Sequence, residues 1–231
     1  MPYRRLPNTD LARIQSLTRA VEQGESLGYL DLPYAYSVHT QAVDLLEKME
    51  RANAEYQVAY ERQVNFAKDY QKKMKMAKLY VSHFIQVFQL SVIRGEIKEE
   101  MRALYHLPLK GFAVPELNTE AALLEWGEYI IAGEKERTEK GSSPIYNPSI
   151  AKVRVFYDNF VDARNAKNVL QANTKRAMLT LDNLHATVDA LILEIWNAVE
   201  NHYKDLPLQD RLDACRKFGI NYYYRKGEKA E

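Results

Sequence analysis

Three side chains that can bind a metal or move a proton lie within two turns of one predicted helix. Asp182, His185 and Asp189 are separated by three and four residues, which places them on one helical face. An imidazole between two carboxylates suits a single metal or a proton relay. His185 also falls on an apolar seam, where a lone histidine is more typical of a hydrogen-bonded core residue, and we favour that interpretation. No cofactor is predicted.

A second set of polar side chains interrupts the apolar seams of the two longest predicted helices. Charged groups on a helix face that is otherwise buried need partners or water. The pattern therefore leaves two alternatives where these helices meet, a small-ligand site in a buried cavity or a middle that is open to solvent. The candidate ligand-binding residues are Gln63, Lys73, Arg164, Lys167, Gln171 and Thr174.

Three further features carry reactive or charged groups, and each has a plain structural interpretation. Cys215 precedes Arg216 and Lys217, whose charges would lower the pKa of a thiol, but no Cys–His–Asp arrangement accompanies it. Residues 133–143 lack the Gly-Lys-Ser/Thr core of a phosphate loop and are typical of a solvated helix end. Five lysines in residues 68–78 alternate with apolar residues, so nucleic-acid binding is not favoured.

Two long stretches without glycine or proline, residues 38–94 and 149–204, must position these groups. Apolar residues recur in both every three or four positions, which is typical of a helix that buries one stripe. Two rows with a spacing of seven form a heptad-like seam in each stretch. The rows begin at Ala42 and Leu45 in the first stretch and at Ile150 and Val153 in the second.

The seams stay in phase through their polar middles, which favours one continuous helix in each stretch. An unbroken helix of 57 residues would be about 85 Å long at 1.5 Å per residue. The alternative breaks the stretches near residues 65–71 and 165–173, where asparagines are poor helix formers, and gives a compact four-helix bundle. Both predict an all-α fold, an antiparallel helical bundle that resembles a four-helix bundle.

A shorter helix is predicted before each long stretch, over residues 6–21 and 119–137, and a last one over residues 208–217. Asn8-Thr9-Asp10 and Asn118-Thr119-Glu120 supply N-cap residue types at equivalent places. The repeated order predicts a single helical domain, residues 1–231, that arose by internal duplication. Its pseudo-repeats would cover residues 6–107 and 116–220. The alternative is that two unrelated amphipathic helices look alike.

The composition indicates a soluble globular protein. Lys and Arg number 32 and Asp and Glu 31, so a net charge of +1 offers no global attraction for nucleic acid or an anionic membrane. One cysteine cannot form an intramolecular disulfide. The most apolar window, residues 79–93, is shorter than the roughly 20 residues of a membrane span, and the N-terminus lacks the apolar segment of a signal peptide. We expect a cytoplasmic location.

Several short motifs give the chain a resemblance to a known family. They are Ala77-Lys78-Leu79-Tyr80-Val81-Ser82-His83-Phe84-Ile85-Gln86-Val87, Arg94-Gly95-Glu96, Leu124-Glu125-Trp126-Gly127-Glu128, Gly133-Glu134, Pro144-Ile145-Tyr146-Asn147-Pro148-Ser149-Ile150-Ala151 and Ile195-Trp196-Asn197. Together they resemble a family of uncharacterised helical proteins from Bacteroidetes-type gut bacteria, over nearly the whole chain. The resemblance implies an all-helical cytoplasmic protein, and it implies no activity and no functional residues.

The pattern as a whole favours a non-enzymatic helical scaffold or protein-interaction module. It contains no readable catalytic constellation, and long amphipathic helices commonly serve self-association or binding of another protein. The alternative is a bundle that binds a small molecule or a metal and that could be an enzyme. A buried cavity at the polar middles would favour the alternative, and middles open to solvent would favour the scaffold.

Overall fold

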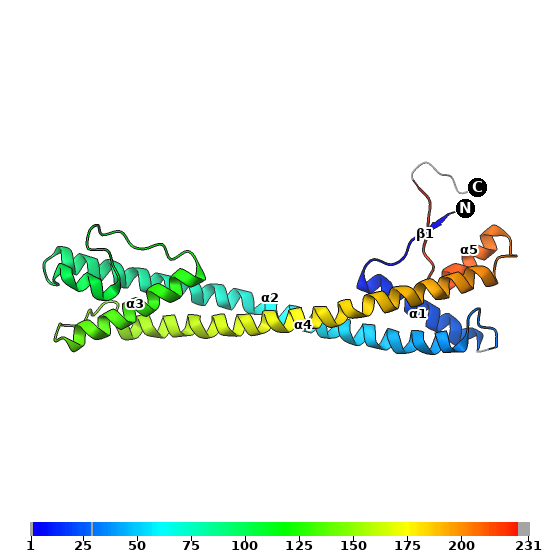
Figure 1. Ribbon diagram of the computed structural model, residues 1–231, viewed down its shortest axis with the longest axis horizontal. Coiled ribbons are helices and arrows are strands. Elements are labelled where there is room, and N and C mark those ends of the chain that lie inside the picture. The colour runs from blue at the N-terminus through cyan, green and yellow to red at the C-terminus, as the bar shows by residue number, and fades with distance from the viewer. Residues whose placement is uncertain (1, 29, 226–231) are drawn as a thin grey trace. The chain divides into compact units, whose positions relative to one another are not determined.

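The computed structural model describes residues 2–28 and 30–225, and it confirms the all-α prediction (Figure 1). Two short strands are its only extended elements among these residues. No helix in the described part of the chain combines the length and the apolar character that crossing a bilayer requires. In chain order the elements are β1 (Tyr3–Arg4), α1 (Asp10–Leu27), α2 (Tyr36–Ile93), the 3-10 helix η1 (Glu99–Tyr105), α3 (Glu120–Glu139), α4 (Ile150–His202), α5 (Leu208–Lys217) and β2 (Tyr222–Tyr223).

Both long stretches are continuous helices, of 58 residues in α2 and 53 in α4. The alternative with a break near residues 65–71 and 165–173 is therefore wrong. The asparagines that suggested it, Asn165, Asn168 and Asn173, lie exposed on α4. At such positions they cost only their intrinsic helix propensity, at most about 0.7 kcal/mol each, which packing of the same helices elsewhere outweighs.

The heptad-like rows face the interior at both ends of the long helices. No member of the two rows of α2 is exposed, and Ala42, Met49, Ala77 and Phe84 are fully buried. In α4 the row that begins at Val153 is likewise free of exposed residues. The other row of α4 leaves the interior in its middle, where its members are exposed to solvent. At the centre of α4 only the row that begins at Val153 is shielded from solvent, whereas near its ends both rows are.

The chain forms two compact units, each of which uses both long helices. Unit 1 comprises Met1–Tyr60 and Asn173–Glu231, and unit 2 comprises residues 61–172. Each unit therefore contains the start of one long helix, the end of the other, and the shorter elements next to them. Each predicted pseudo-repeat contributes to both units. The prediction of a single duplicated domain stays a prediction.

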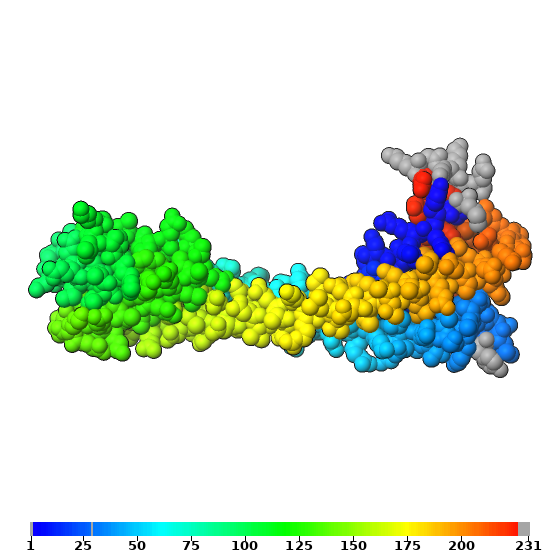
Figure 2. Space-filling view, viewed as in Figure 1, coloured from blue at the N-terminus to red at the C-terminus, as the bar shows by residue number. Residues whose placement is uncertain are grey.

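The core of unit 1 lies between α1, α5 and the adjoining parts of α2 and α4. Its fully buried side chains include Leu17, Met49, Trp196 and Phe218. The ends of the described chain pair as an antiparallel two-stranded sheet, with Tyr3 opposite Tyr223. Figure 2 shows the N-terminal segment, in blue, lying against the orange part of α4. The sheet was not evident from the sequence, because strands of two residues carry no periodicity.

The core of unit 2 is rich in aromatic side chains. Phe84 and Phe88 of α2 pack against Tyr105 at the end of η1, and Phe160 of α4 packs against Tyr70. Helix α3 packs against η1 and completes this cluster with Leu123 and Ile130, among others. Unit 2 therefore has its own hydrophobic core.

Candidate functional site

The predicted polar seam residues Arg164 and Lys167 have a partner on α3. The Lys167 ammonium donates a hydrogen bond to the Glu120 carboxylate and lies 4.5 Å from the centre of the Tyr70 ring. Arg164 Nε lies 3.5 Å from the other carboxylate oxygen of Glu120. Hydrogen bonds from Lys167 and then Tyr70 hold the pKa of Glu120 below its usual range. The charges on this part of the seam are thus neutralised within the protein.

The other four predicted ligand-binding residues are engaged separately or face solvent. Lys73 pairs with Asp69 on the preceding turn at 2.8 Å. The Thr174 hydroxyl donates to a backbone carbonyl of α2, that of Ala59, at 3.2 Å. Gln63 is half-buried and Gln171 is exposed. The structure thus joins only Arg164 and Lys167, through Glu120, and a ligand site made of all six stays a prediction.

The predicted metal residues on α4 are held by the start of α1. His185 Nε2 lies 2.5 Å from an oxygen of Asp10, and His185 Nδ1 lies 3.8 Å from Asp182. Asp189 accepts two hydrogen bonds from the Arg13 guanidinium, at 2.8 and 3.0 Å. Among the described residues no group of three or more His, Cys, Asp or Glu side chains is arranged to hold a metal ion. Arg13 is one reason, because its guanidinium binds both carboxylate oxygens of Asp189, one of the three candidate metal ligands.

The two short helices bind the long helix α4 in the same way. Thr9 caps α1 by accepting a hydrogen bond from Ala12 N, and Thr119 caps α3 by accepting one from Ala122 N. The first residue of each helix, Asp10 or Glu120, then contacts a basic group of α4. An acid in the first turn also interacts favourably with the helix dipole. The two N-cap motifs are thus alike in sequence and also in the contact that their acidic residue makes with α4.

A buried charged network that the sequence did not suggest lies in unit 2. Arg137 donates from Nε to Glu134 at 2.9 Å and to the Tyr105 hydroxyl at 2.8 Å, and Tyr105 in turn donates to Glu134. The side chains of Glu134 and Arg137 are 0% and 1% exposed. The interpretation of residues 133–143 as a solvated helix end is therefore wrong for these two residues.

The network also fastens the loop that follows α3. Glu134 accepts from the backbone N–H of Ile145 at 2.9 Å, and Arg137 donates to the carbonyl of Ser143 at 2.9 Å. Burial, and next the hydrogen bond to Glu134, raise the pKa of Tyr105, so the phenol stays protonated and donates. Because both Glu134 oxygens and the Tyr105 hydroxyl have partners, this arrangement is suited to holding η1, α3 and the loop together rather than to transferring a proton.

Cys215 is fully buried, and burial raises the pKa of its thiol. This corrects the expectation that Arg216 and Lys217 would lower it. Both neighbours are exposed, and the Arg216 guanidinium pairs with Asp213 at 2.7 Å. The environment is that of an inert core cysteine.

We therefore expect the Cys215 thiol to react with a disulfide reagent only when unit 1 opens. In the native protein its rate of reaction should be at least roughly 100-fold lower than in the chain unfolded by guanidinium, because a buried thiol needs local unfolding to react. The release of thionitrobenzoate at pH 8 measures both rates. Similar rates in the folded and unfolded chain would contradict the burial of Cys215.

The middles of the long helices are the most exposed helical surface. Residues 53–69 of α2 and 164–180 of α4 include no buried residue. They nevertheless expose large apolar side chains, which are those of Val58, Tyr60, Val64, Val169, Met178 and Leu179. The sequence left two alternatives for this region, a buried cavity or helix middles open to solvent. The exposed residues correspond to the second alternative.

No family model, no curated protein and no solved structure matches the chain. The resemblance to helical proteins of Bacteroidetes-type bacteria stays a prediction.

Proposed function

We propose that the protein is a non-enzymatic helical scaffold that assembles with a second copy of itself through the exposed middles of α2 and α4. The observation that carries the proposal is the set of apolar side chains on helix segments that have no buried residue. In the part that belongs to unit 1 these include Val58, Tyr60, Met178 and Leu179. Burying such side chains against another helix pair releases roughly 25 cal/mol per Å² of apolar surface.

Within the part that belongs to unit 1, the charges of these segments favour a second copy over a different partner. Glu55 on α2 is exposed and forms no ion pair with another described residue, and the same holds for Lys175 and Arg176 on α4. We propose a two-fold symmetric dimer in which α2 of one copy lies against α4 of the other, so that each contact occurs twice. Such packing would give Glu55 a basic partner and would continue the heptad-like seam as a coiled coil.

A cytoplasmic location belongs to the same proposal. The chain has one cysteine, which is buried with a raised thiol pKa. A chain with one cysteine forms no intramolecular disulfide, so its folding does not require an oxidising compartment. The near balance of acidic and basic residues likewise supports a protein partner over a nucleic acid.

Native mass spectrometry and light scattering test the assembly. We expect the wild-type protein to have twice the mass of one 26.8 kDa chain at about 10–100 μM, the range in which modest interfaces saturate. Leu179→Asp places a charge among the apolar contacts and should weaken association at least about tenfold, because an unpaired charge is costly in an interface. Leu179 is exposed within one chain, so the circular dichroism of the variant should not change.

The matched control is Leu90→Asp, which changes an exposed leucine of α2 in unit 2, outside the middle segments. This variant should keep the wild-type mass. A wild-type protein that stays at 26.8 kDa up to about 100 μM would overturn self-association, as would equal dissociation of the Leu90 and Leu179 variants.

A further inference from the structure

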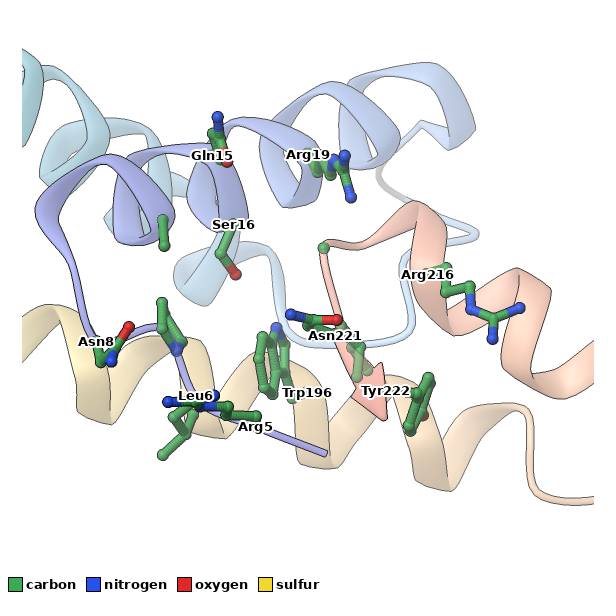
Figure 3. Close-up of a pocket in the computed structure, with 14 residues that line it drawn as sticks. Arg5, Leu6, Asn8, Gln15, Ser16, Arg19, Trp196, Arg216, Asn221 and Tyr222 are labelled. Carbon is green, nitrogen blue, oxygen red and sulfur yellow. The ribbon is translucent and has the colours of Figure 1, made fainter. Parts of the chain in front are cut away.

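Unit 1 contains a cavity of about 540 Å³ that plays no part in the proposed assembly. It lies between α1, the Trp196 region of α4 and the two end segments of the described chain (Figure 3). Its size is in the range of small-molecule sites. Figure 3 shows Ser16 and Asn221 near its middle, with Arg19 on α1 and Arg5 on the N-terminal segment at different sides.

The cavity has a positive lining. Arg5, Arg19 and Arg216 line it, and no aspartate or glutamate does. Arg216 has a carboxylate partner outside the cavity, Asp213 at 2.7 Å. The guanidinium groups of Arg5 and Arg19 form no ion pair or hydrogen bond with a described residue. Two exposed arginines on separate elements thus line a common cavity without a carboxylate partner among the described residues.

A carboxylate that lies near the cavity does not reduce this charge. Glu200 is bound by Arg4 at 3.0 Å and accepts a hydrogen bond from the Tyr222 hydroxyl at 2.7 Å. Its negative charge is therefore compensated by groups other than Arg5 and Arg19. The lining thus keeps an excess of basic side chains, and clefts lined by positive charge concentrate anions.

Ser16 provides an independent, unpaired polar group at the cavity. Its residue is only 6% exposed, and its buried hydroxyl has no hydrogen-bond partner. The hydroxyl points from α1 toward the space beside Asn221 and Trp196 (Figure 3). Buried hydroxyls in native proteins are nearly always paired, so an unpaired one calls for a group that completes it. Asn8, Gln15 and Asn221 add amide donors to the same lining.

We propose that this cavity binds a small molecule that carries a phosphate group. Guanidinium groups bind phosphate oxygens through paired N–H donors, and a dianion matches two uncompensated arginines better than a monocarboxylate does. The Ser16 hydroxyl and the lining amides would donate to the remaining oxygens. Trp196 and Ile220 form an apolar side of the cavity, against which the non-phosphate part of the molecule can rest.

Titration calorimetry with inorganic phosphate and pyrophosphate, at constant ionic strength, tests the site. We expect saturable binding, tighter for pyrophosphate, that weakens about tenfold or more in Arg19→Gln, because that variant removes a charge-assisted hydrogen bond. Arg51→Gln is the control, since Arg51 is an exposed arginine of the same unit that pairs with Glu47 and does not line the cavity. It should bind pyrophosphate as the wild type does.

Ser16→Ala separates a ligand role from a structural one. The variant removes an unpaired buried hydroxyl, so the free protein should keep or slightly raise its melting temperature while pyrophosphate binding weakens. A lower melting temperature with unchanged binding would show a structural serine and overturn the proposal. Absence of saturable binding up to about 10 mM, equal loss in Arg51→Gln, or equal binding of succinate would also overturn it.

Discussion

Arg137→Met should lower the free energy of unfolding by about 3–5 kcal/mol, because it leaves the Glu134 carboxylate buried without its cation. Arg137 donates four hydrogen bonds: two to the Glu134 carboxylate one turn earlier in α3, one to the Tyr105 hydroxyl and one to the Ser143 carbonyl. A neutral side chain of similar length preserves the packing volume but none of these contacts. Guanidinium denaturation followed by circular dichroism measures the loss.

Two further variants show that the effect belongs to the buried network. Glu136→Gln breaks an exposed pair with Lys140, 2.7 Å long and on the same helix, and should cost less than about 1 kcal/mol. Glu134→Gln combined with Arg137→Met should cost less than the sum of the two single changes, since neither partner is then left charged and alone. A loss below about 1 kcal/mol for Arg137→Met would show that the network contributes little.

The periodicity of the sequence was sufficient to predict the two long helices and the interior side of α2, but not the short helix η1. The spacing of seven from Ala42 to Phe84 marks the interior side of α2, and the N-caps Thr9 and Thr119 mark the starts of α1 and α3. Both signals are local, so a single sequence reveals them. Continuity of the long helices was not decidable in this way, because the polar middles suit a solvated helix and a turn equally well.

The sites were harder to predict because their partners come from distant parts of the chain. Lys167 and His185 were recognised as seam residues that need partners, but Glu120 and Asp10 lie 47 and 175 residues away. Local spacing cannot connect such pairs. The Arg5, Arg19 and Ser16 cavity was missed for the same reason, since its lining comes from α1, α4, α5 and the two end segments of the described chain.

The buried network did leave a signal in the sequence. Leu123, Gly127 and Ile130 define the buried stripe of α3, and the same steps of three and four continue to Glu134 and Arg137. Charged residue types hid this continuation, since an i,i+3 pair of opposite charge is usually exposed on a helix. Following the stripe regardless of residue type would have placed both residues in the core.

Gly133→Ala should destabilise the protein by about 1–3 kcal/mol, although alanine is the better helix former. Gly133 lies inside α3 and is buried, where helix propensity alone predicts a gain of about 1 kcal/mol. A Cβ there would lie 2.6 Å from the carbonyl oxygen of Leu104 and 2.9 Å from the Tyr105 ring. A backbone oxygen cannot turn aside as a side chain can, so α3 must move away from η1 and from the Tyr105 hydroxyl.

A variant of the neighbouring exposed residue, Ala132, separates the steric cost of a side chain at Gly133 from the effect of helix propensity. Ala132→Gly makes the reverse change one position earlier in α3 and should cost about 1 kcal/mol through propensity alone. Both variants are thus expected to melt at a lower temperature, by about 2–4 °C for each kcal/mol in a chain of this size. A rise in melting temperature for Gly133→Ala would mean that η1 does not approach α3 as closely as its contacts with Glu134 and Arg137 require.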